Sequence, residues 1–92
     1  MKIGTIALGE RPVLLAPMED VTDIAFRLMC KRFGADMVYT EFVSSDALIS
    51  NVTTTTAKLA VSDEERPVAI ATHGHDVVTI VEATRHCQPA KP

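Results

Sequence analysis

Three segments, each a β-rich apolar run followed by a helical pattern, constrain most strongly what this chain can fold into. The runs cover residues 13–16, 37–43 and 67–71. The first is apolar without alternation, which is typical of a strand covered on both faces in a parallel sheet. Successive strand–helix units with short connections give a right-handed parallel sheet with helices packed on it. The sequence therefore predicts an α/β fold.

The helix after the first strand carries the clearest local signals. Thr22 or Asp23 can cap its first turn, and Gly34 supplies a carboxyl-terminal stop. One helical face is expected to pack on the sheet: Ala25, Leu28, Met29 and Phe33. The basic side chains are expected on the solvated face: Arg27, Lys31 and Arg32.

The second unit is less regular. Ser44 or Ser45 can cap a short helix that ends near Ile49. The four threonines at 53–56 are β-branched and stiff, so they predict a break or a frayed turn. Residues 57–61 are expected to resume a helical turn, and residues 62–66 to form a solvated polar connector.

In the third unit, Gly74 and Asp76 form a loop and a helix cap. The helix that follows is predicted at 77–84, with one apolar face: Val77, Ile80, Val81 and Thr84. At the two ends, residues 3–8 predict a short irregular strand, and residues 88–92 an unstructured tail.

Composition excludes several classes of function. The formal net charge is −3 and only four residues are aromatic, which disfavours a self-sufficient nucleic-acid binder. Two cysteines without paired spacing indicate a reducing compartment rather than a disulfide scaffold. No apolar run is long enough for a membrane span, and no signal core follows the amino terminus, so we expect a cytoplasmic protein without a membrane partner.

A zinc site is not expected, although four suitable ligands occur late in the chain: His73, His75, His86 and Cys87. About 16 Å of helix separates the two pairs, whereas ligands lie about 2.0–2.3 Å from one zinc ion. Glu41 ends the second strand and could face a cofactor pocket. Pairing with a backbone donor is the favoured role, because an unpaired buried carboxylate is costly.

The turn at residues 16–23, Ala-Pro-Met-Glu-Asp-Val-Thr-Asp, is the strongest local signal for a ligand. In parallel α/β folds, ligands bind beyond the carboxyl ends of the strands, where this turn is expected. Proline fixes the chain direction, and methionine offers a soft apolar edge to a flat ring. The residues alone also allow an ordinary strand-to-helix turn.

Several motifs in order resemble one family. They are Leu15–Asp23, Phe26-Arg27, Cys30-Lys31, Phe33–Ala35, Val38–Glu41 with Ser44-Ser45, and Glu65–Ile70. Together they are similar to the flavin-dependent tRNA-dihydrouridine synthases, especially the bacterial B-type branch. The likeness is close over residues 1–70 and looser to about residue 85.

This resemblance implies a TIM barrel that binds FMN at the carboxyl ends of its strands, and a helical domain that grips tRNA. The family reduces the C5–C6 bond of uridines in tRNA. NADPH reduces the flavin, hydride passes to C6, and a cysteine supplies the proton to C5. The uridine must leave its stack to reach the flavin.

Carried over by position, the resemblance implies cofactor contacts at Pro17, Met18 and Glu19, mainly through the backbone and the methionine stem. The family's flavin-bonding glutamine corresponds to Ala71, which can neither donate nor accept through its side chain. The family's acid lies in an Asn-x-Gly-Cys-Pro loop. Neither Cys30 nor Cys87 matches it, so no catalytic residue is assigned, and Cys30 is expected to be packed or half-buried.

A complete barrel needs eight strand–helix units and ~250 residues, and this chain supplies about three. We therefore expect residues 1–92 to be the truncated amino-terminal part of a flavin-binding barrel domain, inactive alone. The alternatives are a non-catalytic remnant or interaction module, and a different flavin barrel related to dihydroorotate or dihydropyrimidine dehydrogenases.

Overall fold

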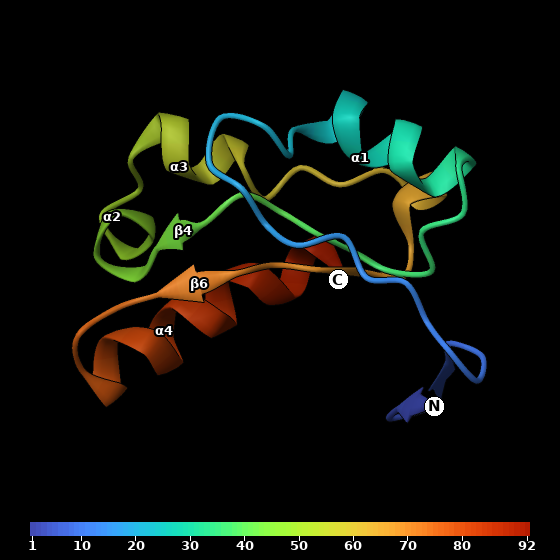
Figure 1. Ribbon diagram of the computed structural model, residues 1–92. Coiled ribbons are helices and arrows are strands. Elements are labelled where there is room, and N and C mark those ends of the chain that lie inside the picture. The colour runs from blue at the N-terminus through green and yellow to red at the C-terminus, as the bar shows by residue number, and fades with distance from the viewer.

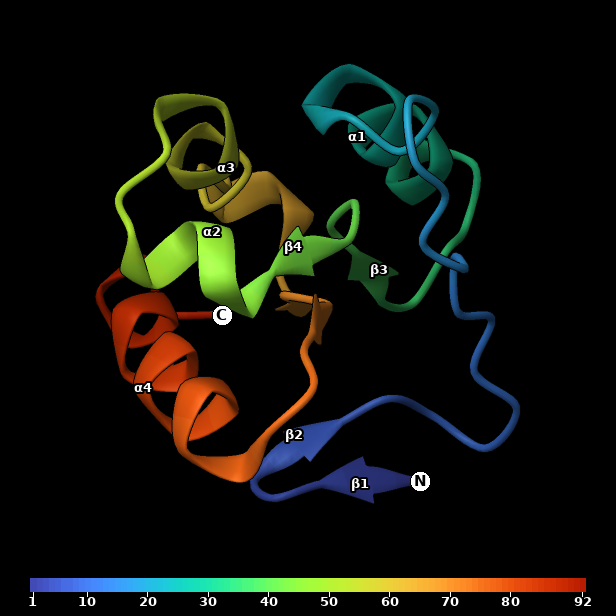
Figure 2. The same ribbon diagram turned by 90° about the vertical axis from the view of Figure 1, so that its left-hand side faces the viewer.

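The computed structural model describes residues 1–92 and confirms an α/β chain with parallel strands (Figures 1 and 2). Its strands are β1 (Lys2–Ile3), β2 (Ile6–Ala7), β3 (Val38–Tyr39), β4 (Val43–Ser44), β5 (Val68–Ala69) and β6 (Thr72–His73). Its helices are α1 (Ile24–Arg32), α2 (Ser45–Ile49), α3 (Thr53–Ala57) and α4 (Val77–Cys87), with short 3₁₀ helices η1 (Asp63–Glu65) and η2 (Gln88–Ala90).

The three predicted β runs lie side by side, in parallel and in chain order. Leu14 forms a parallel bridge with Met37, at the edge of the second run. Strand β3 then pairs with β5, and β4 pairs with β6. The second run is broken into β3 and β4. The third run contains β5, and β6 follows beyond its predicted end at residue 71.

The first run differs from its prediction in one respect. It is held to the second run by Leu15 N–H, which donates to Met37 O at 2.9 Å, and by Asp36 N–H, which donates to Val13 O at 2.8 Å. It is not covered on both faces, since Val13 and Leu14 are exposed. No other strand pairs with its outer edge.

Helix α1 has the predicted ends. Asp23, rather than Thr22, is the amino-terminal cap, and its carboxylate accepts from Phe26 N–H at 2.9 Å. Gly34 follows the helix with φ 109°, a conformation that glycine adopts without strain. Ala35 N–H donates back to Cys30 O at 3.0 Å, which satisfies one of the last helical carbonyls.

The predicted faces of α1 are largely wrong, although Arg32 is exposed as expected. Phe33 is 86% exposed and Met29 52%, whereas Arg27, expected in solvent, is only 3% exposed. Periodicity correctly groups the apolar side chains on one side of the helix, but the strands and η1 lie against another side. The apolar face is therefore left open.

The hydrophobic core lies between α2 and α4. Val43, Leu48, Ala83 and Cys87 are buried there, with Ile49, Leu59 and Ile70 packed around them. In both views α2 lies between α3 and α4 (Figures 1 and 2). Helix α4 is longer than predicted, since it continues to Cys87. Its packed face also differs from the predicted one: Ala83 and Cys87 face the core, while Val77 is 77% exposed. A small alanine lets the two helices approach closely.

Three local predictions are corrected. The threonine run forms helix α3 instead of a break, and the turn expected at 57–61 is its end; Thr56 Oγ1 donates to Thr53 O at 3.0 Å, which ties its hydroxyl into the helix. Residues 3–8 belong to an antiparallel hairpin, β1–β2. The tail contains η2, and Arg66 holds it by donating to the carbonyls of Ala90 and Lys91.

The connector at 62–66 is also less solvated than predicted, because Glu65 is completely buried. Asp76 caps α4 as predicted, accepting from Thr79 N–H at 2.9 Å, and Ser44 caps α2. None of the helices combines the length and apolar character required to cross a bilayer.

Candidate functional site

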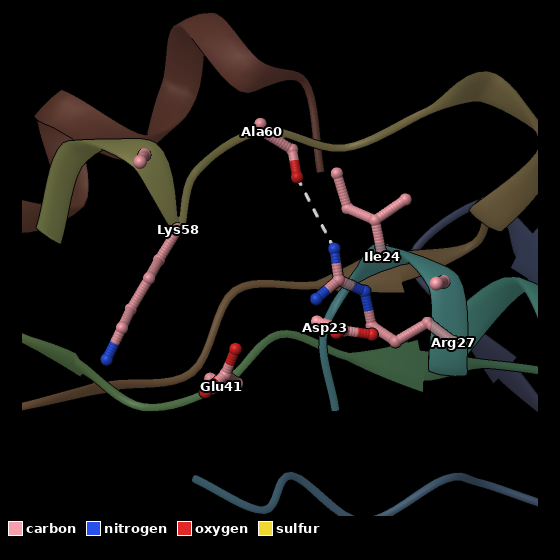
Figure 3. Close-up of a pocket in the computed structure, with 8 residues that line it drawn as sticks. Asp23, Ile24, Arg27, Glu41, Lys58 and Ala60 are labelled. Atoms are coloured by element: carbon pink, nitrogen blue, oxygen red, sulfur yellow. Dashed lines mark hydrogen bonds between the residues drawn. The ribbon is translucent and has the colours of Figure 1, made fainter. Parts of the chain in front are cut away.

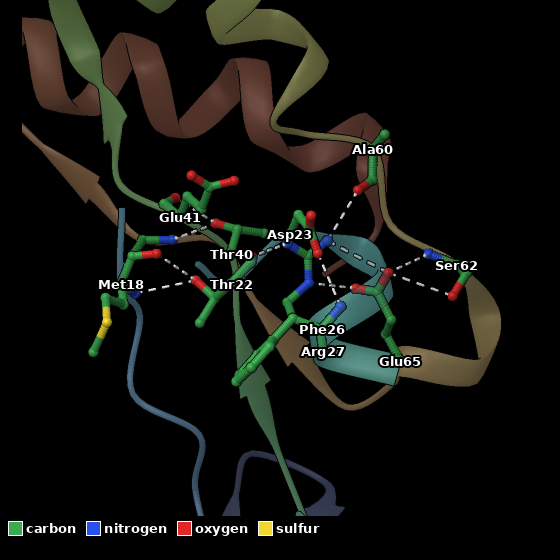
Figure 4. Close-up of polar contacts among 11 residues, drawn as sticks. Met18, Thr22, Asp23, Phe26, Arg27, Thr40, Glu41, Ala60, Ser62 and Glu65 are labelled. Atoms are coloured by element: carbon green, nitrogen blue, oxygen red, sulfur yellow. Dashed lines mark hydrogen bonds and ion pairs between the residues drawn. The ribbon is translucent and has the colours of Figure 1, made fainter. Parts of the chain in front are cut away.

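The turn that follows the first parallel run is held closed by a buried threonine. Residues 16–20 are called here the carboxyl-edge turn, since they leave the carboxyl end of that run. The hydroxyl of Thr22 accepts from Met18 N–H at 3.0 Å and donates to Met18 O at 3.1 Å (Figure 4). Thr22 is 1% exposed. Both polar groups of the Met18 backbone are thus satisfied inside the turn.

A second strand end supports the same turn. Glu41 follows β3, and its Oε2 atom accepts from Asp20 N–H at 2.7 Å. Asp20 has φ 62°, in the left-handed region where residues other than glycine are uncommon. The predicted pairing of Glu41 with a backbone donor is confirmed, although the side chain is half-buried rather than fully buried.

Lys58, just after α3, supplies a third contact. Its Nζ atom donates to Glu19 Oε1 at 2.7 Å and to Phe42 O at 3.3 Å. The Lys58 ammonium holds the pKa of the Glu19 carboxyl below its ordinary value. Sequence reasoning missed Lys58, because 39 residues separate it from Glu19 and no local pattern marks the pair.

Ala71 lies between β5 and β6, beside the residues that follow β3. Its N–H donates to Thr40 Oγ1 at 3.1 Å, and its carbonyl accepts from Val43 N–H at 2.7 Å. Thr40 is completely buried. The Ala71 backbone is therefore fixed between the two strand ends, while its side chain offers only a methyl group.

A cavity of about 340 Å³ opens between the start of α1 and the end of α3 (Figure 3). Its lining mixes charged and apolar side chains: Asp23, Ile24, Ala25, Arg27, Glu41, Ala57, Lys58 and Ala60. Two of these residues, Glu41 and Lys58, also hold the carboxyl-edge turn. The cavity therefore adjoins the turn that the sequence singled out.

Arg27, which lines this cavity, belongs to a buried ion pair that sequence reasoning did not predict. Arg27 Nε donates to Glu65 Oε2 at 2.9 Å, and Arg27 also donates to the carbonyls of Thr22 and Ala60 (Figure 4). Glu65 in turn accepts from Ser62 N–H. The pair joins the start of α1 to η1 and to the segment after α3.

Acidic side chains, rather than histidines, are the metal-ligand types that converge. Glu19, Asp20 and Glu41 each place a carboxylate oxygen within 4.8 Å of the other two. Glu19 is already paired with Lys58, and Glu41 with the Asp20 amide. Two of the three carboxylates therefore already have a partner within the protein. Cys30 is half-buried on α1, as predicted.

The structure thus defines an α/β chain whose parallel strand ends carry a fixed turn beside a small cavity. Residues 14–91 match the family of dihydrouridine synthases (Dus). The chain is 38% identical over 86 residues to a probable tRNA-dihydrouridine synthase of Rickettsia prowazekii, and 36% identical over 85 residues to tRNA-dihydrouridine synthase B of Pseudomonas aeruginosa. Each alignment covers 92% of this chain.

The chain belongs to the dihydrouridine synthase family, because that match covers far more than half of its residues. It is also 41% identical over 73 residues to a probable tRNA-dihydrouridine synthase of Aquifex aeolicus; that alignment covers 78% of this chain and 22% of the relative. The chain spans about a quarter of the length of the first two relatives, 26% and 25% respectively.

Proposed function

We propose that residues 1–92 are the amino-terminal part of an FMN-dependent tRNA-dihydrouridine synthase. The complete enzyme would use NADPH to reduce the C5–C6 bond of uridine in tRNA. The observation that carries the proposal is the family match over residues 14–91, joined to a fixed turn at the carboxyl ends of parallel strands. That edge is where parallel α/β folds bind their ligands.

The three parallel runs are proposed to be an arc of a TIM barrel. They neighbour one another in chain order, which is how consecutive strands are arranged in such a barrel. The exposed apolar residues of the first run and of α1 would then be covered by further barrel segments. This arrangement also explains why Phe33 has no partner within these residues.

The carboxyl-edge turn fits a flavin. The proposed contacts are Pro17, Met18 and Glu19, of which Met18 is 54% exposed and free to lie against a flat ring. The N–H of Glu19 has no acceptor within the protein, so it can donate to a ring oxygen or nitrogen. When bound, FMN would supply the two-electron chemistry that no side chain can provide. Ala71 contributes no side-chain hydrogen bond.

Neither cysteine is proposed as the acid that protonates C5. Cys30 lies on α1, and Cys87 is buried in the core, where burial raises the pKa of its thiol. The net charge of −3 offers tRNA little attraction, so the main tRNA surface is proposed to lie outside these residues. A cytoplasmic location is proposed, because tRNA is modified there.

A second candidate is a non-catalytic interaction module derived from the same barrel. The observation in its favour is Ala71, whose methyl group cannot replace the hydrogen bond of the family glutamine. Under this alternative the open face of α1 would bind another protein chain. It predicts a folded chain that never supports dihydrouridine formation.

A chimera separates the two candidates. Residues 14–91 would replace the matching segment of the Pseudomonas aeruginosa relative, and the chimera would be expressed in cells that lack their own B-type synthase. We expect dihydrouridine to return to tRNA, as measured by mass spectrometry of digested nucleosides. The matched control carries the same segment from the Rickettsia prowazekii relative.

The outcome against the proposal is specific. The control chimera would restore dihydrouridine, and the test chimera would be equally soluble and show the same circular dichroism spectrum, yet would produce none. That result would favour the interaction module, since folding and assembly would have succeeded without chemistry.

A further inference from the structure

Two side chains from distant segments bind adjacent residues of the carboxyl-edge turn. Glu41 Oε2 accepts from Asp20 N–H, and Lys58 Nζ donates to Glu19 Oε1, both at 2.7 Å. The contacts bridge 21 and 39 residues of sequence. They therefore report tertiary structure and are not a consequence of the turn's own conformation.

Lys58 also ties the two supports to each other. Besides Glu19, it donates to Phe42 O, the carbonyl of the residue that follows Glu41. One ammonium group thus connects the turn after the first run with the connection between β3 and β4. With three donor hydrogens, Lys58 can make both bonds at once.

The turn needs such support because its backbone is not in a relaxed state. Asp20 adopts φ 62°, a conformation that costs free energy for any residue with a side chain. Glu19, which precedes it, carries the N–H without a protein acceptor. A turn that relaxed at Asp20 would therefore move the free donor as well.

We infer that Lys58 is a positioning residue for the cofactor turn: together with Glu41 it clamps Glu19 and Asp20 so that the free Glu19 N–H keeps one orientation. The inference rests on the proposed flavin site for its purpose, but the clamp itself is a property of these residues. Lys58 touches no reacting atom in this account. Its contribution to flavin binding is to lower the ordering cost of the turn.

The clamp is tested without any flavin. Amide hydrogen exchange of Asp20 and Val21 would be measured by NMR on the 92-residue chain and its Lys58→Met variant. We expect exchange at these amides to become about two- to fivefold faster, the range that a partly exposed ion pair supports. The matched control is Lys2→Met, because the Lys2 side chain is exposed and forms no hydrogen bond or ion pair.

A charge exchange provides the rescue. The double variant Lys58→Glu with Glu19→Lys restores the ion pair in reverse but not the bond to Phe42 O, so we expect exchange at Asp20 to return part of the way to its native rate. Urea unfolding of every variant measures global stability, and a loss in Lys58→Met large enough to accelerate exchange equally at amides far from the turn would count against the clamp. Unchanged exchange in Lys58→Met, or equal acceleration in Lys2→Met, would overturn the clamp.

The effect of the clamp on FMN binding is measured separately, in the Pseudomonas chimera. Lys58→Met is expected to weaken FMN binding by about two- to fivefold. The control in the chimera is Lys91→Met, which should leave binding unchanged, because Lys91 lies within residues 14–91 and only its backbone takes part in hydrogen bonds. If exchange accelerates but FMN affinity stays the same, the clamp exists and its role in cofactor positioning is wrong. If the unmodified chimera binds no FMN, the proposed function fails while the exchange result still decides the clamp.

Discussion

Arg27 and Glu65 form an ion pair that is almost completely removed from solvent. Their Nε and Oε2 atoms lie 2.9 Å apart, and the side chains are 3% and 0% exposed. The pair joins α1 to η1 across 38 residues of sequence. Because it also caps the carbonyls of Thr22 and Ala60, it fixes the residues on which the carboxyl-edge turn and the cavity rest.

Replacing Arg27 with Met should destabilise the chain by about 3–5 kcal/mol, because Glu65 would be left as a buried charge without a partner. Urea unfolding followed by circular dichroism measures the change. Arg32→Met is the matched control: Arg32 lies 3.8 Å from Glu64 and both side chains are exposed, so its loss should cost about 0–1 kcal/mol. Equal effects of the two substitutions would contradict the buried pair.

Gly74 is expected to resist substitution, since the space for a side chain is already filled. A Cβ atom there would lie 3.0 Å from Ile80 Cγ1 and 3.1 Å from the side chain of Ser45. Gly74→Ala should therefore cost about 1–3 kcal/mol of stability. Thermal unfolding measures it, and a neutral result would show that α2 and α4 are less closely packed than described.

Ser45 offers the complementary test. Its hydroxyl is buried and has no hydrogen-bond partner. Ser45→Ala removes an unsatisfied polar group at almost no loss of volume, so stability should stay the same or rise by up to about 1 kcal/mol. In the Gly74→Ala background the same change should recover part of the lost stability. A marked loss on Ser45→Ala would mean that the hydroxyl does have a partner.

The Asp76 cap predicts a pH dependence of stability. Hydrogen bonds from the hydroxyl and the N–H of Thr79 hold the pKa of Asp76 below its ordinary value of 3.8. A depressed folded-state pKa stabilises the fold above the unfolded pKa, and the gain is lost as pH falls through the folded value. Asp76→Ala should therefore lower the melting temperature at pH 7.

The same substitution should begin to matter less as the pH falls below about 4, where the carboxyl of the unfolded state becomes protonated. It should matter least below the depressed folded-state pKa, where the carboxyl is protonated in both states. Melting curves of the native chain and of Asp76→Ala, recorded from pH 7 downward, measure the difference. Asp76→Asn keeps a capping oxygen and serves as control. A difference that is constant over the whole pH range would contradict an ionised cap.

Ala71 makes a prediction about cofactor affinity. In the Pseudomonas chimera, Ala71→Gln restores a side chain that can hydrogen-bond a flavin, worth about 0.5–1.5 kcal/mol or roughly two- to tenfold in affinity. FMN titration monitored by flavin absorbance measures the change. Ala71→Leu, which adds volume without polarity, is the control and should not tighten binding. An equal gain from leucine would rule out the hydrogen bond as the cause.

Local signals in the sequence predict where the helices begin and end. Features that depend on long-range contacts could not be predicted. Asp23, Gly34 and Asp76 cap or stop their helices as predicted, because a cap depends on a few neighbouring residues. The face of α1 that meets the strands could not be deduced, since periodicity groups side chains without showing what lies opposite. For this reason the sequence alone predicts a solvated Arg27.

The candidate site divides in the same way. The turn at residues 16–23 was found from its composition and its place after a β-rich run, and Glu41 was expected to bond a backbone donor. Lys58 was missed, because its partner Glu19 is distant in sequence and the threonine run before it predicted a break. That run forms α3, which brings Lys58 to the turn.

The most direct test of the central claim is an FMN titration of the purified Pseudomonas chimera and its Met18→Asp variant. The claim is that the carboxyl-edge turn lies against the flavin, and it predicts one FMN per chimera. Met18→Asp should weaken binding about tenfold or more, because an added carboxylate would be desolvated against the ring. A chimera that binds FMN equally well with aspartate at this position would contradict the claim.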